Sequence, residues 1–152
     1  MYAFLDCPLS LLDRGGRLLV WAMRHWAKAV SCGRCPCGDV GPAFHKADLM
    51  AGFPHFHMMM AVVNRHAREK LSFADVDCPR LSDGEALLLS LIRLPGGAHA
   101  DQTPATVALV VQPEGAPAMR MALDSLGAAL RTVELWPALP MFDPATIRFP
   151  NE

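Results

Sequence analysis

Prolines and glycines divide this sequence into short apolar segments, and that division limits the folds open to it. The chain has 13 prolines and 11 glycines, and most of them lie between segments in which apolar residues recur every three or four positions. That period is typical of amphipathic helices, whereas proline and glycine end them. The sequence therefore predicts an all-α fold, a compact bundle of about five or six short helices.

Apolar stripes and helix-opening prolines locate most of these helices. The first expected helix carries tryptophan and histidine among the residues that fall on one of its faces at helical spacing: Leu18, Trp21, Ala22, His25, Trp26 and Ala29. Four of the expected helices cover residues 10–30, Pro42 to near Gly52, Pro54 to about Leu71, and residues 118–133.

The clearest helix start is the segment Ser82-Asp83-Gly84-Glu85. The Ser82 hydroxyl can accept from the Glu85 amide while the Glu85 carboxylate accepts from the Ser82 amide, which is the capping-box arrangement. The helix that follows should end at Pro95. The acidic residues here suit capping and the helix dipole better than catalysis.

Residues 105–112 are ambiguous because they are rich in β-branched side chains. A helix is favoured, and a strand over residues 105–111 would make the fold α+β instead. We expect residues 1–135 to form a single mainly helical domain. Residues 136–152 contain four prolines and no apolar period, so we expect an extended C-terminal tail with Trp136 and Phe142 as candidate anchors.

Composition restricts the partners that this protein can have. Hydrophobic residues make up 52% of the chain and charged residues 19%, which is enough for a core and for an apolar surface that binds a protein partner or forms a homodimer. The formal net charge of -1 gives no general attraction to nucleic acid, so nucleic-acid binding is not expected. The longest apolar runs fall short of the roughly 20 residues that membrane insertion needs. The N-terminus lacks the features of a signal peptide, so we expect a cytoplasmic protein with reduced thiols.

The most specific motif is a cysteine cluster on an expected loop between helices. Cys32, Cys35 and Cys37 lie within six residues, and closely spaced thiolates suit a structural zinc ion with tetrahedral sulfur and imidazole ligands. A fourth ligand is required, and His45, eight residues after Cys37, is nearest in sequence. Cys78 or Cys7 could take that place through the fold. Unligated thiols, thiol redox chemistry and an iron–sulfur centre remain alternatives.

Other motifs favour a non-enzymatic protein. No phosphate-binding loop, dinucleotide fingerprint, nucleophile elbow or zinc-protease helix occurs in the sequence. The segment His55-Phe56-His57-Met58-Met59-Met60 has side chains that suit copper. On a helix, however, His55 and His57 lie about 200° apart, so they cannot share an ion without fraying of the first turn.

Residues Leu81 to Ile92 resemble the first helix of many winged-helix regulators, in which a capped turn precedes a leucine-rich stripe. The resemblance covers 12 of the 152 residues and implies a DNA-binding transcription regulator. The recognition helix of such a regulator carries a basic face. Residues 105–112 carry no charge, and residues 118–133 have only Arg120 and Arg131 as basic residues.

These features together predict a small non-enzymatic regulatory or adaptor protein whose cysteine loop holds structural zinc and whose apolar surface binds a protein partner or a second copy. A winged-helix transcription regulator is the first alternative function. A thiol-based redox protein is the second.

DNA binding separates the adaptor from the winged-helix regulator. Because few phosphates could be neutralised, we expect no binding of random duplex DNA at about micromolar protein and near-physiological salt. An electrophoretic mobility shift measures this. A clear shift whose affinity falls steeply with salt would contradict the adaptor interpretation and favour the regulator.

Overall fold

The computed structural model describes residues 3–140, and six α-helices make up most of that range. Within these residues the only β-pairing is two isolated bridges, so the predicted all-α bundle is confirmed. The helices are α1 (Arg14–Ser31), α2 (Pro36–Lys46), α3 (Phe53–His66), α4 (Asp83–Arg93), α5 (Thr103–Val110) and α6 (Ala116–Thr132), with short 3₁₀ turns η1 (Leu9–Leu11) and η2 (Ala100–Gln102).

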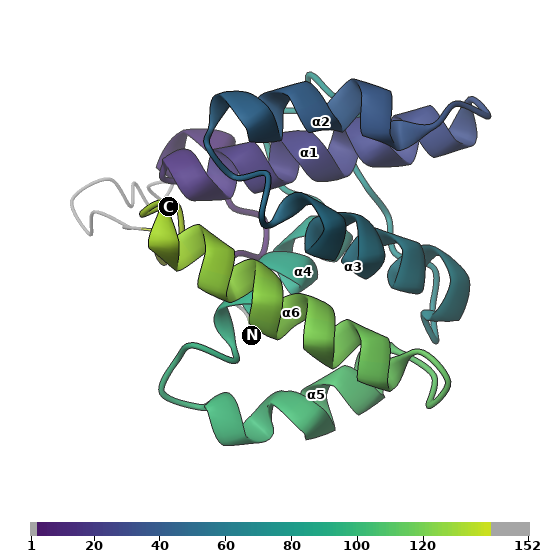
Figure 1. Cartoon of the computed structure of the whole chain (residues 1–152), viewed down its shortest axis with the longest axis vertical. Coiled ribbons are helices and arrows are strands. Elements are labelled where there is room, and N and C mark those ends of the chain that lie inside the picture. Colours follow the sequence, from purple (N-terminus) through teal and green to yellow (C-terminus); the bar gives the residue numbers. More distant parts are fainter. Residues whose placement is uncertain (1–2, 141–152) are drawn as a thin grey trace, which may run out of the picture.

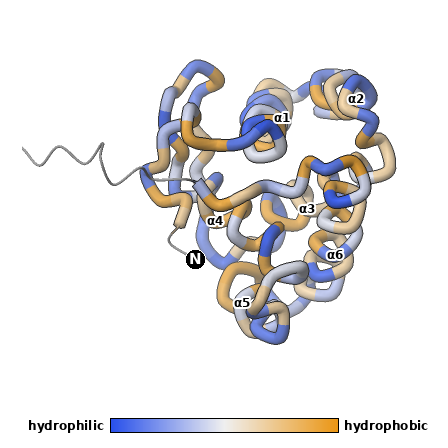
Figure 2. The backbone as a smooth tube through the Cα atoms, turned by 90° about the vertical axis from the view of Figure 1, so that its left-hand side faces the viewer, coloured by the Kyte–Doolittle hydropathy of each residue, from blue (hydrophilic) through white to orange (hydrophobic). Residues whose placement is uncertain are grey.

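The helices form two pairs around a central helix (Figure 1). α1 packs along α2, and α3 packs along α6. α4 lies between α1 and α5 (Figure 2). Most of its residues are buried. α5 closes the far side of the bundle against α6 and α4. No helix within residues 3–140 combines the length and apolar composition that crossing a membrane requires.

α1 begins where the C-terminal segment crosses it. The Asp13 side chain caps the helix by accepting a hydrogen bond from the Gly16 amide at 2.9 Å. A Cβ atom on Gly15 would lie 1.8 Å from the carbonyl oxygen of Leu135, so the close approach of the two segments requires glycine. The expected start near residue 10 was therefore too early, because η1 occupies that stretch.

α2 begins at Pro36, and the prediction that Pro42 opens this helix was wrong. Pro36 occupies the first turn, where the missing N–H has no helical partner to lose. Pro42 lies inside the helix, on its exposed side. Because proline has no backbone N–H, it cannot donate the usual helical hydrogen bond to the carbonyl four residues earlier. Residues 36–38 of the expected cysteine loop therefore belong to the helix.

α3 ends at His66, before the expected end near Leu71. Ala67 turns to an extended conformation, because the chain here pairs with the end of α5. The Arg68 amide donates to the Val110 carbonyl at 2.9 Å, and the Gln112 amide donates to the His66 carbonyl at 2.8 Å. This pairing fixes the two helix ends against each other.

The capping box at the start of α4 is confirmed, since Ser82 and Glu85 exchange both hydrogen bonds. The helix ends at Arg93, just before Pro95.

The structure also decides between helix and strand for residues 105–112. α5 is a helix, so the preference for helix over strand was right despite the β-branched side chains.

A buried ion pair connects α1 to α4. The Arg24 guanidinium donates from Nε to Glu85 Oε1 at 2.9 Å and from Nη2 to Glu85 Oε2 at 3.1 Å, and both side chains are almost completely buried. The other donors of Arg24 bind the carbonyl oxygens of Val76, Cys78 and Arg80. Sequence reasoning assigned Glu85 only a capping role and did not single out Arg24.

Residues 136–140 lie against α1 and α4. The Ala138 amide donates to Asp13 Oδ2 at 2.9 Å, and the Arg93 guanidinium lies 4.3 Å from the Trp136 ring centroid and donates to the Pro137 carbonyl. Burial lowers the pKa of Arg93, and the nearby Asp13 acts in the opposite direction. The second candidate anchor, Phe142, lies outside the described residues.

The buried ion pair should dominate the stability of the bundle. In a Glu85→Ala variant, Arg24 keeps a buried charge without its counter-ion, so we expect a loss of about 3–5 kcal/mol in the free energy of unfolding, measured by urea denaturation.

Asp39→Ala provides the matched control, because it removes the carboxylate of the exposed Arg34–Asp39 pair. Its unfolding midpoint should stay close to that of the wild type, since exposed ion pairs contribute little. A Glu85→Ala midpoint equal to that of the control would show that the buried pair does not hold the fold.

Candidate functional site

The three clustered cysteines lie on the short turn between α1 and α2, and all three are exposed. Cys32 follows the last residue of α1, and Gly33 has the positive φ of 71° that this turn requires. Cys35 is the N-cap residue of α2, and Cys37 lies in its first turn. An exposed ion pair between Arg34 and Asp39, at 3.0 Å, closes the turn.

The environment of this turn affects its thiols unequally. The pKa of the Cys37 thiol is raised, first by partial burial and then by its hydrogen bond to Cys35 and the charge on that thiol. Because metal binding requires thiolates, Cys37 must lose a proton before it can bind a metal ion.

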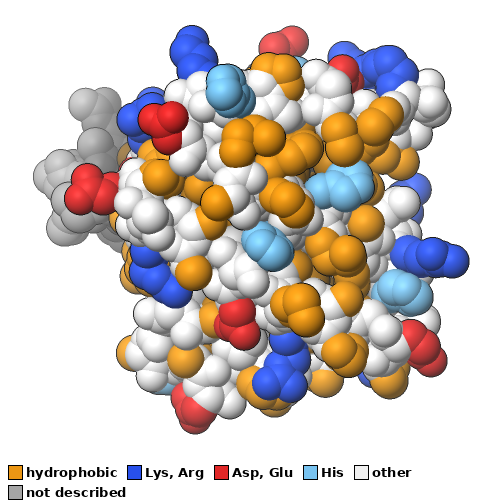
Figure 3. All heavy atoms as spheres, in the orientation of Figure 1, with side chains coloured by type: hydrophobic (Ala, Val, Ile, Leu, Met, Phe, Trp, Pro, Cys, Tyr) orange, Lys and Arg blue, Asp and Glu red, His pale blue; other side chains and the backbone are white. Residues whose placement is uncertain are grey.

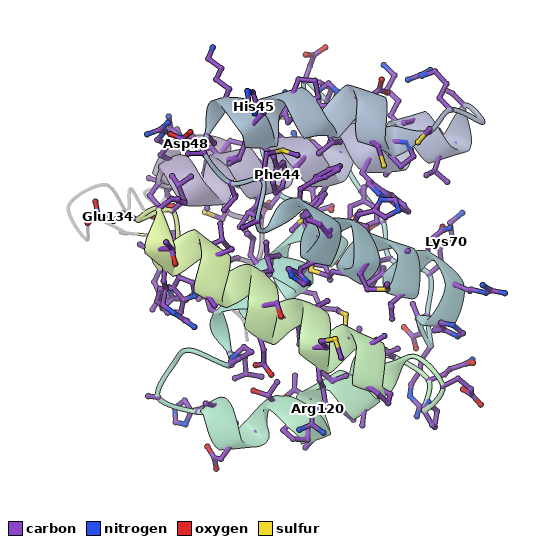
Figure 4. The ribbon with its side chains drawn as sticks, viewed as in Figure 1. Phe44, His45, Asp48, Lys70, Arg120 and Glu134 are labelled. Atoms are coloured by element: carbon purple, nitrogen blue, oxygen red, sulfur yellow. The ribbon has the colours of Figure 1, made fainter. Side chains whose placement is uncertain are left out.

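His45 is not close to these thiols. It lies in the last turn of α2, eight residues after Cys37, which is about 12 Å along the helix axis. Figure 4 shows His45 at the end of α2 away from the α1–α2 turn. Among the residues that the structure describes, no three His, Cys, Asp or Glu side chains are arranged to hold a metal ion.

The two other cysteines lie elsewhere in the fold. Cys7 is buried, and its thiol donates to the Pro8 carbonyl at 3.4 Å. Burial raises the pKa of Cys7, while the charge of Arg80 acts in the opposite direction. Cys78 is half-buried, and its thiol donates to the Arg80 carbonyl.

The histidines of α3 serve packing rather than a shared ion. Trp26 Nε1 donates a hydrogen bond to His57 Nδ1 at 3.0 Å, so this ring nitrogen is already used in joining α1 to α3. Met59 and Met60, which follow closely, are buried as expected of core residues. The arrangement agrees with the helical geometry that separates His55 from His57.

Several large apolar side chains remain exposed on α3, on α6 and on the turn that precedes α3. Met50, Met58 and Met121 are 46%, 47% and 66% exposed, and we call this set the methionine face. Figure 3 shows apolar side chains, with histidines and some charged groups between them, over the side of the molecule on which α3 and α6 lie in Figure 1. Residues 53–64 of α3 contain no Lys, Arg, Asp or Glu.

Sequence reasoning missed this face, although the sequence contains a signal for it. Met58, Met59 and Met60 are consecutive, and consecutive residues on a helix lie about 100° apart. All three cannot share one buried stripe, so one of them had to face outward. Which one does so depends on where α6 packs.

Comparison with known protein families, with curated proteins and with solved structures finds no match for this chain.

Proposed function

We propose that this chain is a small, non-enzymatic, cytoplasmic regulatory or adaptor protein that binds a second copy of itself through the methionine face. The observation that supports this proposal is the exposure of Met50, Met58 and Met121, together with the absence of charged side chains from residues 53–64 of α3. Methionine is enriched at protein interfaces and charged residues are depleted from their centres. Its flexible side chain also adapts to different packing partners.

Charge favours a second copy as the occupant. The net charge of -1 produces little long-range repulsion between copies. On the exposed side of α6, Arg120 and Asp124 lie close to Met121 in sequence and carry opposite signs. In an antiparallel pair of α6 helices related by a two-fold axis, Arg120 of each copy would approach Asp124 of the other. The methionines would then be buried between the copies.

Self-association is tested by measuring mass in solution. Light scattering coupled to size-exclusion chromatography should give twice the chain mass of 16.5 kDa for the wild type. Met58→Glu and Met121→Glu should shift the protein to the monomer, because each places a charge in the apolar contact.

Leu139→Glu is the matched control, since Leu139 is 52% exposed but belongs to the segment that lies against α1. It should leave the dimer intact. A wild type that stays monomeric as its concentration is raised would contradict self-association, and the methionine face would then require a different protein as its partner.

A second candidate function is zinc binding at the α1–α2 turn, and the exposure of all three clustered cysteines favours it. Cys32, Cys35 and Cys37 supply soft ligands within six residues of sequence. The turn would have to close to bring Cys32 in. His45 could join only if α2 rearranged, because it lies near the opposite end of that helix.

Elemental analysis tests zinc binding in protein purified without added metal. We expect about one zinc ion per chain, released on acidification because the ligands must be thiolates. Cys35→Ser should abolish binding, since too few soft ligands remain.

His45→Ala tests the fourth ligand, and loss of zinc in that variant would mean that α2 rearranges around the ion. Metal-free protein with all thiols reactive would end the zinc proposal. A reversible disulfide within the turn under mild oxidant would favour the redox function.

A further inference from the structure

A cavity of about 210 Å³ lies beside α1, on a different part of the fold from the cysteine turn and the methionine face. Its walls come from three segments that are distant in sequence. Leu9 belongs to η1, Val20 and Trp21 belong to α1, and Val76 belongs to the segment that leads to α4. The lining is mainly apolar, which is typical of small-molecule sites.

Trp21 is unusual for a residue on the apolar side of a helix. Helical spacing places it on the same face as the buried residues Ala22 and Trp26, but 37% of its surface is exposed. Its ring lies 4.1 Å from that of His25, measured between centroids, and the two planes are inclined by 33°. Trp21 stays exposed because α1 turns this side toward the cavity and not toward another helix.

His25 also lines the cavity, where its ring packs against Trp21. Its Nε2 atom is buried and forms no hydrogen bond with a described protein group. Because Nε2 exposes almost no surface, a ligand in the cavity meets the imidazole ring beside Trp21 and not this nitrogen.

An arginine that lines the cavity supplies a positive charge. Arg24 also lines the cavity, but Glu85 neutralises it and backbone carbonyls take its remaining donors. Arg17 donates only to the Ser10 carbonyl, at 3.1 Å, and no carboxylate within residues 3–140 forms an ion pair with it. Arg17 is therefore the cation available to an anionic ligand.

The spacing of Arg17 and Trp21 sets the size of the ligand. These two residues are four positions apart, so they lie on one side of α1 and about 6 Å apart along the helix axis. A ligand that contacts both needs only one ring with an acidic group attached to it.

We propose that this cavity binds a small aromatic carboxylate. The carboxylate accepts hydrogen bonds from Arg17, and the aromatic ring packs on Trp21 and Val76. The wall formed by Val76 is held in place by Arg24, whose Nη1 donates to the Val76 carbonyl. The cavity is thus preformed, which limits the entropy lost on binding.

Titration of the full chain with 4-hydroxybenzoate, followed by proton–nitrogen correlation spectra, tests this proposal. The indole N–H signal of Trp21, assigned with a Trp21→Phe variant, should shift and saturate. Arg17→Gln should raise the dissociation constant about tenfold or more, because it removes a charge-assisted hydrogen bond. The same loss is expected when 4-hydroxybenzamide replaces the acid.

A control variant separates a specific site from general charge attraction. Arg14→Gln removes another exposed arginine of α1 that does not line the cavity, and it should leave the affinity unchanged. Absence of a Trp21 shift at about millimolar ligand, or equal affinities for wild type and Arg17→Gln, would overturn the proposal.

Discussion

The fold depends on the ion pair between Arg24 and Glu85, because it holds in place a long segment that has no regular structure. Residues 67–82 join α3 to α4 without a helix or a strand. Arg24 holds this segment through carbonyl oxygens, and Glu85 holds it through the amides of Ala74 and Ser82. All five guanidinium donors are used, so the buried charge is compensated by its counter-ion and by main-chain dipoles. A geometry with this many partners fixes the position of α1 relative to α4.

The same interaction connects the core to the surface that we propose to bind a ligand. α1 presents Arg24 inward and presents Arg17, Trp21 and His25 toward the cavity. Val76, which forms the opposite wall, belongs to the segment held by Arg24. A change in the ion pair would therefore alter the shape of the cavity. This holds although Arg24 and Glu85 are already paired with each other. The methionine face is more independent, because α3 and α6 position it by their own packing.

Local chemistry explains which features could be predicted from the sequence. The capping box of α4 needs only residues three apart, and the stripe of α6 needs only helical spacing, so both were predicted correctly. The partner of Glu85 lies 61 positions away, which no local pattern reveals. The start of α2 was misplaced because Pro36 and Pro42 both fit a first turn, and the cysteine spacing favoured a loop over Pro36. Neither His25 nor Arg17 was predicted to form a site. α1 has apolar residues on more than one side, and their spacing alone does not identify the side that the other elements leave uncovered.

Surplus apolar composition gives a physical reason for two binding surfaces on so small a protein. With 52% hydrophobic residues, the chain fills its core and still leaves several large apolar side chains exposed. The large ones left outside include Met58 and Met121 on α3 and α6, and Trp21 at the cavity. Charged residues could replace these exposed apolar residues at little cost to stability, since the exposed residues contribute only part of their surface to the core. Exposed apolar groups that are grouped and not scattered are a mark of interaction sites. The positions where burial departs from the helical pattern are therefore the positions where function is expected.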